Sequence, residues 1–238
     1  MWFHREMERR ILEKRSANAR DLGGLPAGGS LTKRGGYIQS FHLDDLDDDG
    51  WRGLLEAGLR TVVDLRGLDE VPPLVLPAGP RAPDGSTGDR GDPAFTRLWA
   101  RLMDSPVYYD DSLARFPTTI ASVFTAFAEA PPGGILFHCG EGRDRSGLIA
   151  AMLLKLVGVR DRIIAEDYES AVRALDVSDG SALDPAETLP AAGVLDAWIA
   201  DTSAELAAFL EGLDVEGFLT RNGLTPKQIA AVRGRLVD

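Results

Sequence analysis

The sequence of 238 residues predicts an α/β fold in which a central, mainly parallel sheet is flanked by helices. One observation is a short apolar run, residues 135–137, which follows a turn-forming segment and has the length of a buried strand. A second is that apolar residues recur at helical spacing after it, from Leu148 until Gly158. A third is the chain length, which suffices to bury one substantial core. We therefore expect one domain over residues 1–238.

The first element that the pattern indicates is a short helix near the N-terminus. Phe3, Met7 and Ile11 are spaced four residues apart, so they share one helical face. We interpret it as a helix for packing or oligomer contact; a frayed arm and a helix on a membrane surface are the alternatives. Its many charged residues leave no apolar core for a secretory signal.

A strand and an acid-rich helix come next. A turn at residues 35–36 precedes a strand at residues 37–39. An acidic run at residues 44–49 leads into a helix at residues 51–55, which ends at Gly58. Acidic side chains stabilise a helix N-terminus, so we favour this interpretation of the run over a metal site.

A strand at residues 61–66 is followed by an insertion at about residues 71–110. Its first part, to Asp92, is rich in proline, glycine and aspartate, which predicts a mobile loop. Because it follows a strand, this loop is placed to act as a lid at the mouth of a site. Three aromatic residues adjoin the amphipathic pair Leu98 and Leu102 and are interpreted as core rather than as a pocket wall: Trp99, Tyr108 and Tyr109.

The last predicted element is a helix with Thr225 as its N-cap and Pro226 in its first position. Ile229, Val232 and Leu236 then recur at helical spacing. The sequence contains no internal repeat.

Charge and cysteine content narrow the functional classes. A formal net charge of −11 argues against nucleic acid and against anionic membranes as partner surfaces. The single cysteine excludes an intramolecular disulfide and fits a reducing compartment. The longest apolar stretch, residues 148–159, contains Lys155 and is too short to cross a bilayer. We therefore expect a cytoplasmic protein without stable membrane insertion.

The most informative segment is residues 138–147, which read H-C-G-E-G-R-D-R-S-G and join the predicted strand to the predicted helix. At such a junction the backbone N–H groups and the helix dipole favour an anion. Gly140 and Gly142 allow the backbone to curl around an oxyanion. Cys139 and Arg145 bracket the loop, so it combines a phosphate trap with a nucleophile.

The side chains of this loop have predicted roles. The electropositive loop favours the thiolate of Cys139, which is the reactive form. Arg145 binds two phosphate oxygens in a fork, and the Ser146 hydroxyl donates to the departing thiolate. His138 orders the loop through backbone hydrogen bonds. The pattern around Cys139 disfavours the alternative that it is a small buried hydrophobe. The remaining loop residues are expected to bind phosphate: Gly140, Glu141, Gly142, Arg143 and Asp144.

The segment that starts at Cys139 resembles the C-x5-R-[ST] signature of cysteine-dependent protein tyrosine phosphatases. With His138 and Gly147 it resembles, more narrowly, the bacterial and fungal tyrosine/serine/lipid (triple-specificity) branch. Three further segments resemble motifs of this branch, in the same order. They are N-A-R-D-L-G-G at residues 18–24, T-V-V-D-L-R at residues 61–66 with Glu70, and I-A-E-D-Y-E-S at residues 164–170. The resemblance covers most of the chain apart from the extreme N-terminus and the insertion.

This resemblance implies a phosphotyrosine-phosphatase-like three-layer fold. It implies a phosphatase that hydrolyses phosphate monoesters through a cysteinyl-phosphate intermediate and releases inorganic phosphate. The implied substrates are phosphotyrosine and also phosphoserine or phosphothreonine, on a protein or a small phosphoester. No metal and no organic cofactor is implied. The alternatives are a phosphoinositide lipid phosphatase and a catalytically weak phosphate-binding module.

The resemblance also implies that the general acid comes from the loop itself, which makes Asp144 the first candidate. The alternative role of Asp144 is to pair with a neighbouring arginine and brace the loop. Asp64 is the second candidate, since it ends a predicted strand where active sites of open α/β sheets lie. We favour for Asp64 an ion pair with Arg66 or Arg20. Asp64 and Arg20 are thus predicted to support the site.

Four positions depart from the branch's pattern. Arg143 stands where lysine is usual, which replaces a point charge with a planar fork. Ser146 replaces threonine and keeps the hydroxyl, and Gln39 stands where an arginine is often found. Glu141 adds a carboxylate to the loop that is predicted to bind the anion. These departures leave the reaction class intact and bear on substrate breadth, above all for highly anionic inositol lipids.

Overall fold

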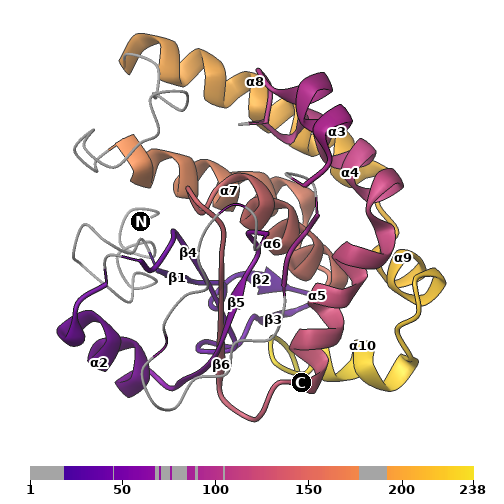
Figure 1. Ribbon diagram of the computed structural model, residues 1–238. Coiled ribbons are helices and arrows are strands. Elements are labelled where there is room, and N and C mark those ends of the chain that lie inside the picture. Colours follow the sequence, from indigo (N-terminus) through magenta and orange to yellow (C-terminus); the bar gives the residue numbers. More distant parts are fainter. Residues whose placement is uncertain are drawn as a thin grey trace.

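We describe the fold from a computed structural model (Figure 1). The described residues are 19–44, 46–67, 70, 76, 85–88, 91–103, 105–176 and 192–238, and side chains at 174–176 and 192–195 are left aside. The predicted N-terminal helix around Phe3, Met7 and Ile11 lies outside these ranges, as do Asn18 and most of the loop predicted up to Asp92.

Four strands form the sheet that carries the site. Its order is β1 (Arg20–Asp21), β4 (Tyr37–Ser40), β6 (Gly134–His138) and β5 (Leu59–Asp64). β4, β6 and β5 run parallel, and only the short edge strand β1 is antiparallel to its neighbour. The predicted central, mainly parallel sheet is therefore confirmed. A separate hairpin is formed by β2 (Pro26–Ala27) and β3 (Ser30–Leu31).

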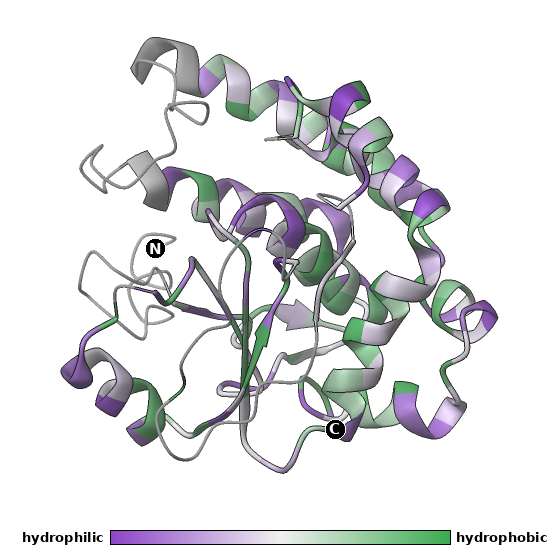
Figure 2. Cartoon of the chain, viewed as in Figure 1, coloured by the Kyte–Doolittle hydropathy of each residue, from purple (hydrophilic) through white to green (hydrophobic). Residues whose placement is uncertain are grey.

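Alternate residues of a strand point to opposite faces of the sheet. Both faces of this sheet carry apolar side chains, and helices cover both. On one face, Ile38 and Leu136 pack with Trp51 and Leu54 of α2 (Asp48–Glu56). On the other face, a larger apolar cluster joins the sheet to α5 (Pro117–Glu129) and α6 (Asp144–Leu156). Figure 2 shows that these helices carry both hydrophilic and hydrophobic residues, as expected for helices with one buried face.

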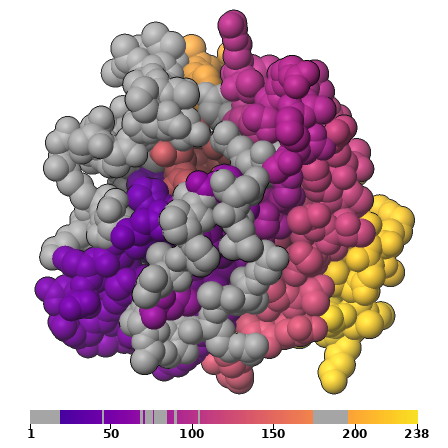
Figure 3. Space-filling model, in the orientation of Figure 1, coloured from indigo at the N-terminus to yellow at the C-terminus, as the bar shows by residue number. Residues whose placement is uncertain are grey.

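The remaining helices extend the larger layer. They are α3 (Pro93–Trp99), the 3-10 helix η1 (Pro106–Tyr108), α4 (Tyr109–Arg115), α7 (Asp161–Asp176), α8 (Ala192–Glu211), α9 (Val215–Arg221) and α10 (Pro226–Arg233). α2 and the C-terminal pair α9 and α10 lie on opposite sides of the molecule, coloured indigo and yellow in Figure 3. Among the described residues, no helix has the length and apolar character needed to cross a membrane.

Most predicted element ends are confirmed by the backbone. Gly58 and Gly158 end α2 and α6 with positive φ angles of 93° and 78°, a conformation that glycine adopts without strain. Thr225 caps α10 in a capping box with Gln228. The strand predicted at residues 61–66 starts earlier and ends at Asp64, so Arg66 lies beyond it.

The aromatic residues of the insertion divide into two groups. Tyr108 and Tyr109 are fully buried in the larger apolar cluster, as predicted, whereas Trp99 is only half-buried against it. Leu98 and Leu102 are 68% and 47% exposed, so the amphipathic pair points to solvent rather than into the core. α3 and η1 lie within the insertion that the sequence predicted at residues 71–110.

Candidate active site

The loop of residues 139–143 leaves the carboxyl end of β6, in the middle of the sheet, and leads into α6. In the strand register, Ser40 of β4 and Asp64 of β5 flank His138, the last residue of β6. The loop therefore lies at the carboxyl edge of three parallel strands, which is where ligands of open α/β sheets bind. The N-terminus of α6 points its backbone N–H groups toward the same place.

Cys139 and Ser146 lie side by side in this loop. The Cys139 Sγ atom is 3.6 Å from the Ser146 Oγ atom, and the two side chains are buried. Cys139 is a free thiol. A hydroxyl at this distance is placed to donate to a thiolate.

Gly142 is needed for the shape of the loop. Its φ angle is +67°, and a Cβ atom built there would lie 2.6 Å from the carbonyl oxygen of Ser40. The backbone of β4 therefore approaches too closely for any side chain at this position. Two hydrogen bonds hold the same stretch: Gln39 Nε2 donates to the Gly142 carbonyl at 2.8 Å, and the His42 N–H donates to the Gly140 carbonyl at 3.0 Å. Glu141, between these anchored residues, is half-buried.

A buried polar chain continues from Gln39 into the fold. Arg20 donates through Nη2 to Gln39 Oε1 at 3.4 Å, and to the carboxylate of Asp167 on α7 at 3.0 Å. Its Nη1 donates to the Asp167 carbonyl at 2.7 Å. Both charged side chains are less than 10% exposed. Arg20, which the sequence predicted to support the site, thus contacts the loop indirectly through Gln39, and Asp167 is its ion-pair partner.

Arg145, in the first turn of α6, is buried and pairs with Glu70. The Nη1 atom of Arg145 is 2.6 Å from Glu70 Oε1 and 3.4 Å from the Leu65 carbonyl. The same Glu70 oxygen accepts from the Gly67 N–H at 2.7 Å, which fixes the carboxylate. Sequence reasoning quoted Glu70 within a motif but gave it no role. Its spacing from the D-L-R strand was the available signal.

Asp144 takes part in a second set of contacts beside the loop, which involves Arg143. Its Oδ1 atom accepts from Arg143 Nε at 2.9 Å, and its carbonyl accepts from the buried Tyr109 hydroxyl at 2.8 Å. The Arg143 guanidinium carbon lies 5.3 Å from the ring centroid of Trp198, on α8. The sequence suggested pairing of Asp144 with a neighbouring arginine, and it gave no signal for Trp198.

Asp64 forms the ion pair with Arg66 that the sequence favoured, rather than one with Arg20. Arg66 donates to both carboxylate oxygens through Nε and Nη2, and its backbone N–H donates to Oδ1. The other edge of Arg66 binds Asp44. The hydrogen bond from Arg66 lowers the pKa of Asp44.

His138 is wholly buried beneath the loop. Its Nδ1 atom is 3.1 Å from the Cys139 carbonyl, so the tautomer with hydrogen on Nδ1 donates there. The Nε2 atom is 3.8 Å from Asp64 Oδ2, which is beyond hydrogen-bonding distance. Burial lowers the pKa of His138, although the nearby Asp64 charge opposes this effect. Burial therefore favours the neutral imidazole of His138, which contacts the loop backbone at the Cys139 carbonyl.

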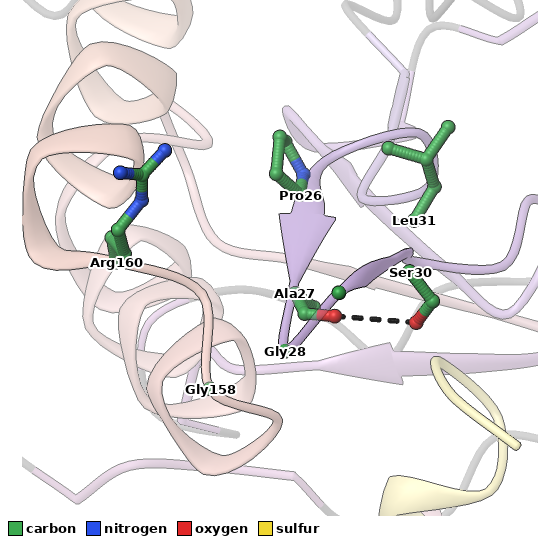
Figure 4. Close-up of a pocket in the computed structure, with 8 residues that line it drawn as sticks. Pro26, Ala27, Gly28, Ser30, Leu31, Gly158 and Arg160 are labelled. Atoms are coloured by element: carbon green, nitrogen blue, oxygen red, sulfur yellow. Dashed lines mark hydrogen bonds between the residues drawn. The ribbon is translucent and has the colours of Figure 1, made fainter.

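A separate cavity of about 680 Å³ lies between the β2–β3 hairpin and the turn that joins α6 to α7 (Figure 4). Residues 26–31 line it together with Gly158 and Arg160. None of the loop residues contributes to this lining, so the cavity is distinct from the candidate site.

Comparison with known proteins agrees with this geometry. A profile described as "Tyrosine phosphatase family" matches residues 13–238. A putative tyrosine-protein phosphatase of Cupriavidus necator is 34% identical over 167 residues, which cover 66% of this chain and 61% of that protein. The triple specificity protein phosphatase PtpB of Mycobacterium tuberculosis is 30% identical over 171 residues, or 56% of this chain and 60% of that protein. This chain thus matches about 60% of the length of each relative.

Proposed function

Because the chain belongs to the tyrosine phosphatase family, we propose that it hydrolyses phosphate monoesters through a cysteinyl-phosphate intermediate. We propose phosphotyrosine as its substrate, with phosphoserine and phosphothreonine as further substrates. The observation that carries the proposal is that Cys139, Arg145 and Ser146 converge on one loop at the start of α6. A relative named a triple specificity phosphatase supports the wider substrate range.

In the first step, the Cys139 sulfur attacks phosphorus in line with the ester oxygen. The S–P bond forms as the P–O bond to the leaving group breaks, and Asp144 donates its proton to the departing oxygen. Arg145 and the loop N–H groups stabilise the charge on the equatorial oxygens. The hydrogen bond that Arg145 Nη1 donates to Glu70 Oε1 orients the Arg145 guanidinium.

In the second step, water attacks phosphorus and gives a proton to Asp144. The S–P bond breaks, and inorganic phosphate leaves. Ser146 donates to the sulfur as it becomes a thiolate, and the 3.6 Å separation of Oγ from Sγ suits this role. The reaction then returns Cys139 and Asp144 to their starting states, with no step that requires a metal or a cofactor.

The hydrogen bonds around the two carboxylates favour Asp144 over Asp64 as the general acid. A general acid needs a carboxyl oxygen that can approach the leaving group, so an oxygen already bound by a guanidinium is less suited to this role. Arg66 binds both oxygens of Asp64, whereas Arg143 binds one oxygen of Asp144. Asp144 also precedes Arg145 directly in the sequence, which supports a role beside the bound phosphate.

The proposal is tested with p-nitrophenyl phosphate, which has an activated leaving group, and phenyl phosphate, which does not. We expect turnover of both, and its loss in Cys139→Ser. Asp144→Asn should slow phenyl phosphate hydrolysis by about 10²–10⁴-fold and p-nitrophenyl phosphate hydrolysis much less. Equal slowing would exclude Asp144 as the acid. Absence of turnover from pH 5 to 8 would favour a catalytically weak phosphate-binding module.

The position of Arg143 bears on the alternative of a phosphoinositide phosphatase. Its side chain is 4% exposed and its guanidinium contacts Asp144 and the Trp198 ring, so its charge is directed into the protein. We therefore expect phosphotyrosine peptides to be better substrates than phosphoinositides. Phosphate release from a panel of both, compared by kcat/KM, measures this preference.

A further inference from the structure

Three side chains from two distant parts of the chain form a continuous contact beside the catalytic loop. Trp198, on α8, lies with its ring 5.3 Å from the guanidinium carbon of Arg143. Arg143 donates in turn through Nε to Asp144. Asp144 and Arg143 are both nearly buried, with side-chain exposures of 7% and 4%. This contact joins α8 to the carboxylate proposed as the general acid.

The contact depends on the shape of arginine. A planar guanidinium presents a flat face to an aromatic ring and an N–H at its edge to a carboxylate at the same time. A lysine ammonium has no plane to stack and no second donor at the Nε position. The chain carries Arg143 where its resemblance led us to expect lysine, and it carries Trp198 where the guanidinium can use it.

Burial makes the contact stronger than a surface contact of the same kind. A cation–π contact at an exposed site is weak, and one removed from water is stronger. Because the Arg143 side chain is 4% exposed, water competes little for its charge. A change at Trp198 therefore alters the position of Arg143 and, through the Nε hydrogen bond, that of the Asp144 carboxylate.

We propose that Trp198 is a positioning residue for catalysis, which acts through Arg143 to aim the Asp144 carboxylate at the leaving-group oxygen. The inference rests on the proposed function, since it assigns to Trp198 a part in leaving-group protonation. It makes α8, which follows the catalytic loop by a long stretch of sequence, a component of the active site. Trp198 itself touches neither the phosphorus nor the sulfur in this proposal.

A purely structural role for Trp198 predicts different kinetics. Trp198 is half-buried and packs on the larger apolar cluster, so its removal also loosens that packing. Loosened packing slows all substrates alike. A misdirected acid slows mainly the substrate whose leaving group needs the proton. Leaving-group dependence therefore separates the two roles.

The experiment compares Trp198→Leu, Trp198→Phe and Arg143→Lys in the full chain with both aryl phosphates. We expect Trp198→Leu to reduce kcat for phenyl phosphate about tenfold and kcat for p-nitrophenyl phosphate less than threefold, with little change in KM. Trp198→Phe, which keeps an aromatic face, should recover most of the loss. Trp198→Leu should add little to the defect of Arg143→Lys, because both changes break one contact.

Trp99→Leu is the matched control, because Trp99 is also half-buried against the larger apolar cluster but lies on α3. It should slow both substrates by one common factor, or by none. Thermal unfolding of each variant identifies a change that fails to fold, in which case Trp198→Phe carries the test. Equal slowing of both substrates by a folded Trp198 variant would overturn the inference, as would full additivity with Arg143→Lys. Absence of Cys139-dependent turnover in the unmodified chain would instead overturn the proposed function, and this inference with it.

Discussion

The catalytic loop is held by two regions that work on different parts of it. In one region, Gln39 and His42 donate hydrogen bonds to backbone carbonyls of the loop, and Arg20 braces Gln39. In the other region, Glu70 contacts the charged side chain of Arg145, and Trp198 contacts that of Arg143. We call the first region the backbone anchors and the second the side-chain partners.

The two regions therefore differ in what they control: the backbone anchors control the shape of the loop, and the side-chain partners control the direction of its charged groups. The backbone anchors hold the curl of the loop, on which the direction of its N–H groups depends. The side-chain partners hold the direction of the Arg145 guanidinium and, through Arg143, of the Asp144 carboxylate. A change among the anchors should therefore impair folding and all substrates together. A change among the partners should destabilise the fold less and alter individual kinetic constants.

Arg20→Met should give the largest effect, because it leaves the buried Asp167 carboxylate without its ion-pair partner. Removing one member of a buried ion pair costs about 3–5 kcal/mol. For a chain of this length, that lowers Tm by roughly 2–4 °C per kcal/mol. Denaturant unfolding measures the loss, and Arg20→Met combined with Asp167→Leu should recover part of it. A free energy of unfolding within 1 kcal/mol of the original would contradict the role of the pair.

Gly142→Ala tests the anchors at the loop itself. The new Cβ would meet the Ser40 carbonyl in a backbone conformation of φ +67°, so the loop must shift. We expect kcat/KM for p-nitrophenyl phosphate to fall by at least about 100-fold, since small displacements of positioning groups have effects of this size. The control is Gly140→Ala, where the new Cβ would have no atom within 4 Å among the described residues other than its chain neighbours, and its loss should be at least about tenfold smaller. Equal losses would show that close approach to β4 is not what the loop requires.

The anchors also show why parts of the site could be predicted from sequence. Cys139, Arg145 and the start of α6 lie within a few residues of one another, so the local sequence pattern was enough to predict that they form one site. The motifs at residues 18–24 and 164–170 are each short, yet they contribute the two members of the Arg20–Asp167 pair. Their joint presence therefore has a physical cause that only the fold reveals.

The side-chain partners were less predictable, because their contacts depend on how segments distant in sequence pack together. Glu70 belongs to a motif that the sequence analysis quoted. Its hydrogen bond with Arg145, however, depends on where the fold puts the segment after β5, which the motif does not show. Trp198 lies on a helix whose sequence carries no motif, and a tryptophan among apolar residues indicates core packing. The prediction that Trp99 belongs to the core was only partly met for the same reason, since helical spacing does not tell which side of α3 faces solvent.

Glu70→Gln tests the partners with a moderate expected effect. The amide keeps the shape but loses the charge that holds Arg145. We expect kcat to fall roughly tenfold, because the fork is less well aligned with the transition state. Product inhibition by inorganic phosphate should change less than threefold. Markedly tighter phosphate binding with unchanged kcat would show instead that Glu70 competes with the phosphate for Arg145.

The smallest expected effect is a pH dependence of stability that comes from beneath the loop. Burial lowers the pKa of His138 in the folded state, while an unfolded histidine titrates near about 6.5. The unfolded chain therefore binds more protons as the pH falls below that value, and the folded state loses stability. The loss from one such group is at most about 1.4 kcal/mol per pH unit.

The variant that isolates this contribution is His138→Asn, whose side-chain amide can still donate to the Cys139 carbonyl. Between pH 6.5 and 5, carboxyl groups with ordinary pKa values stay mostly ionised, so they add little to the pH dependence of stability. We expect the free energy of unfolding to fall across this interval in the original chain and to fall less steeply in the variant. His42→Asn serves as the comparison, because His42 is half-buried beside Asp44 and anchors the loop only through its backbone N–H. If the two variants flatten the profile equally, burial of His138 is not the source of the pH dependence.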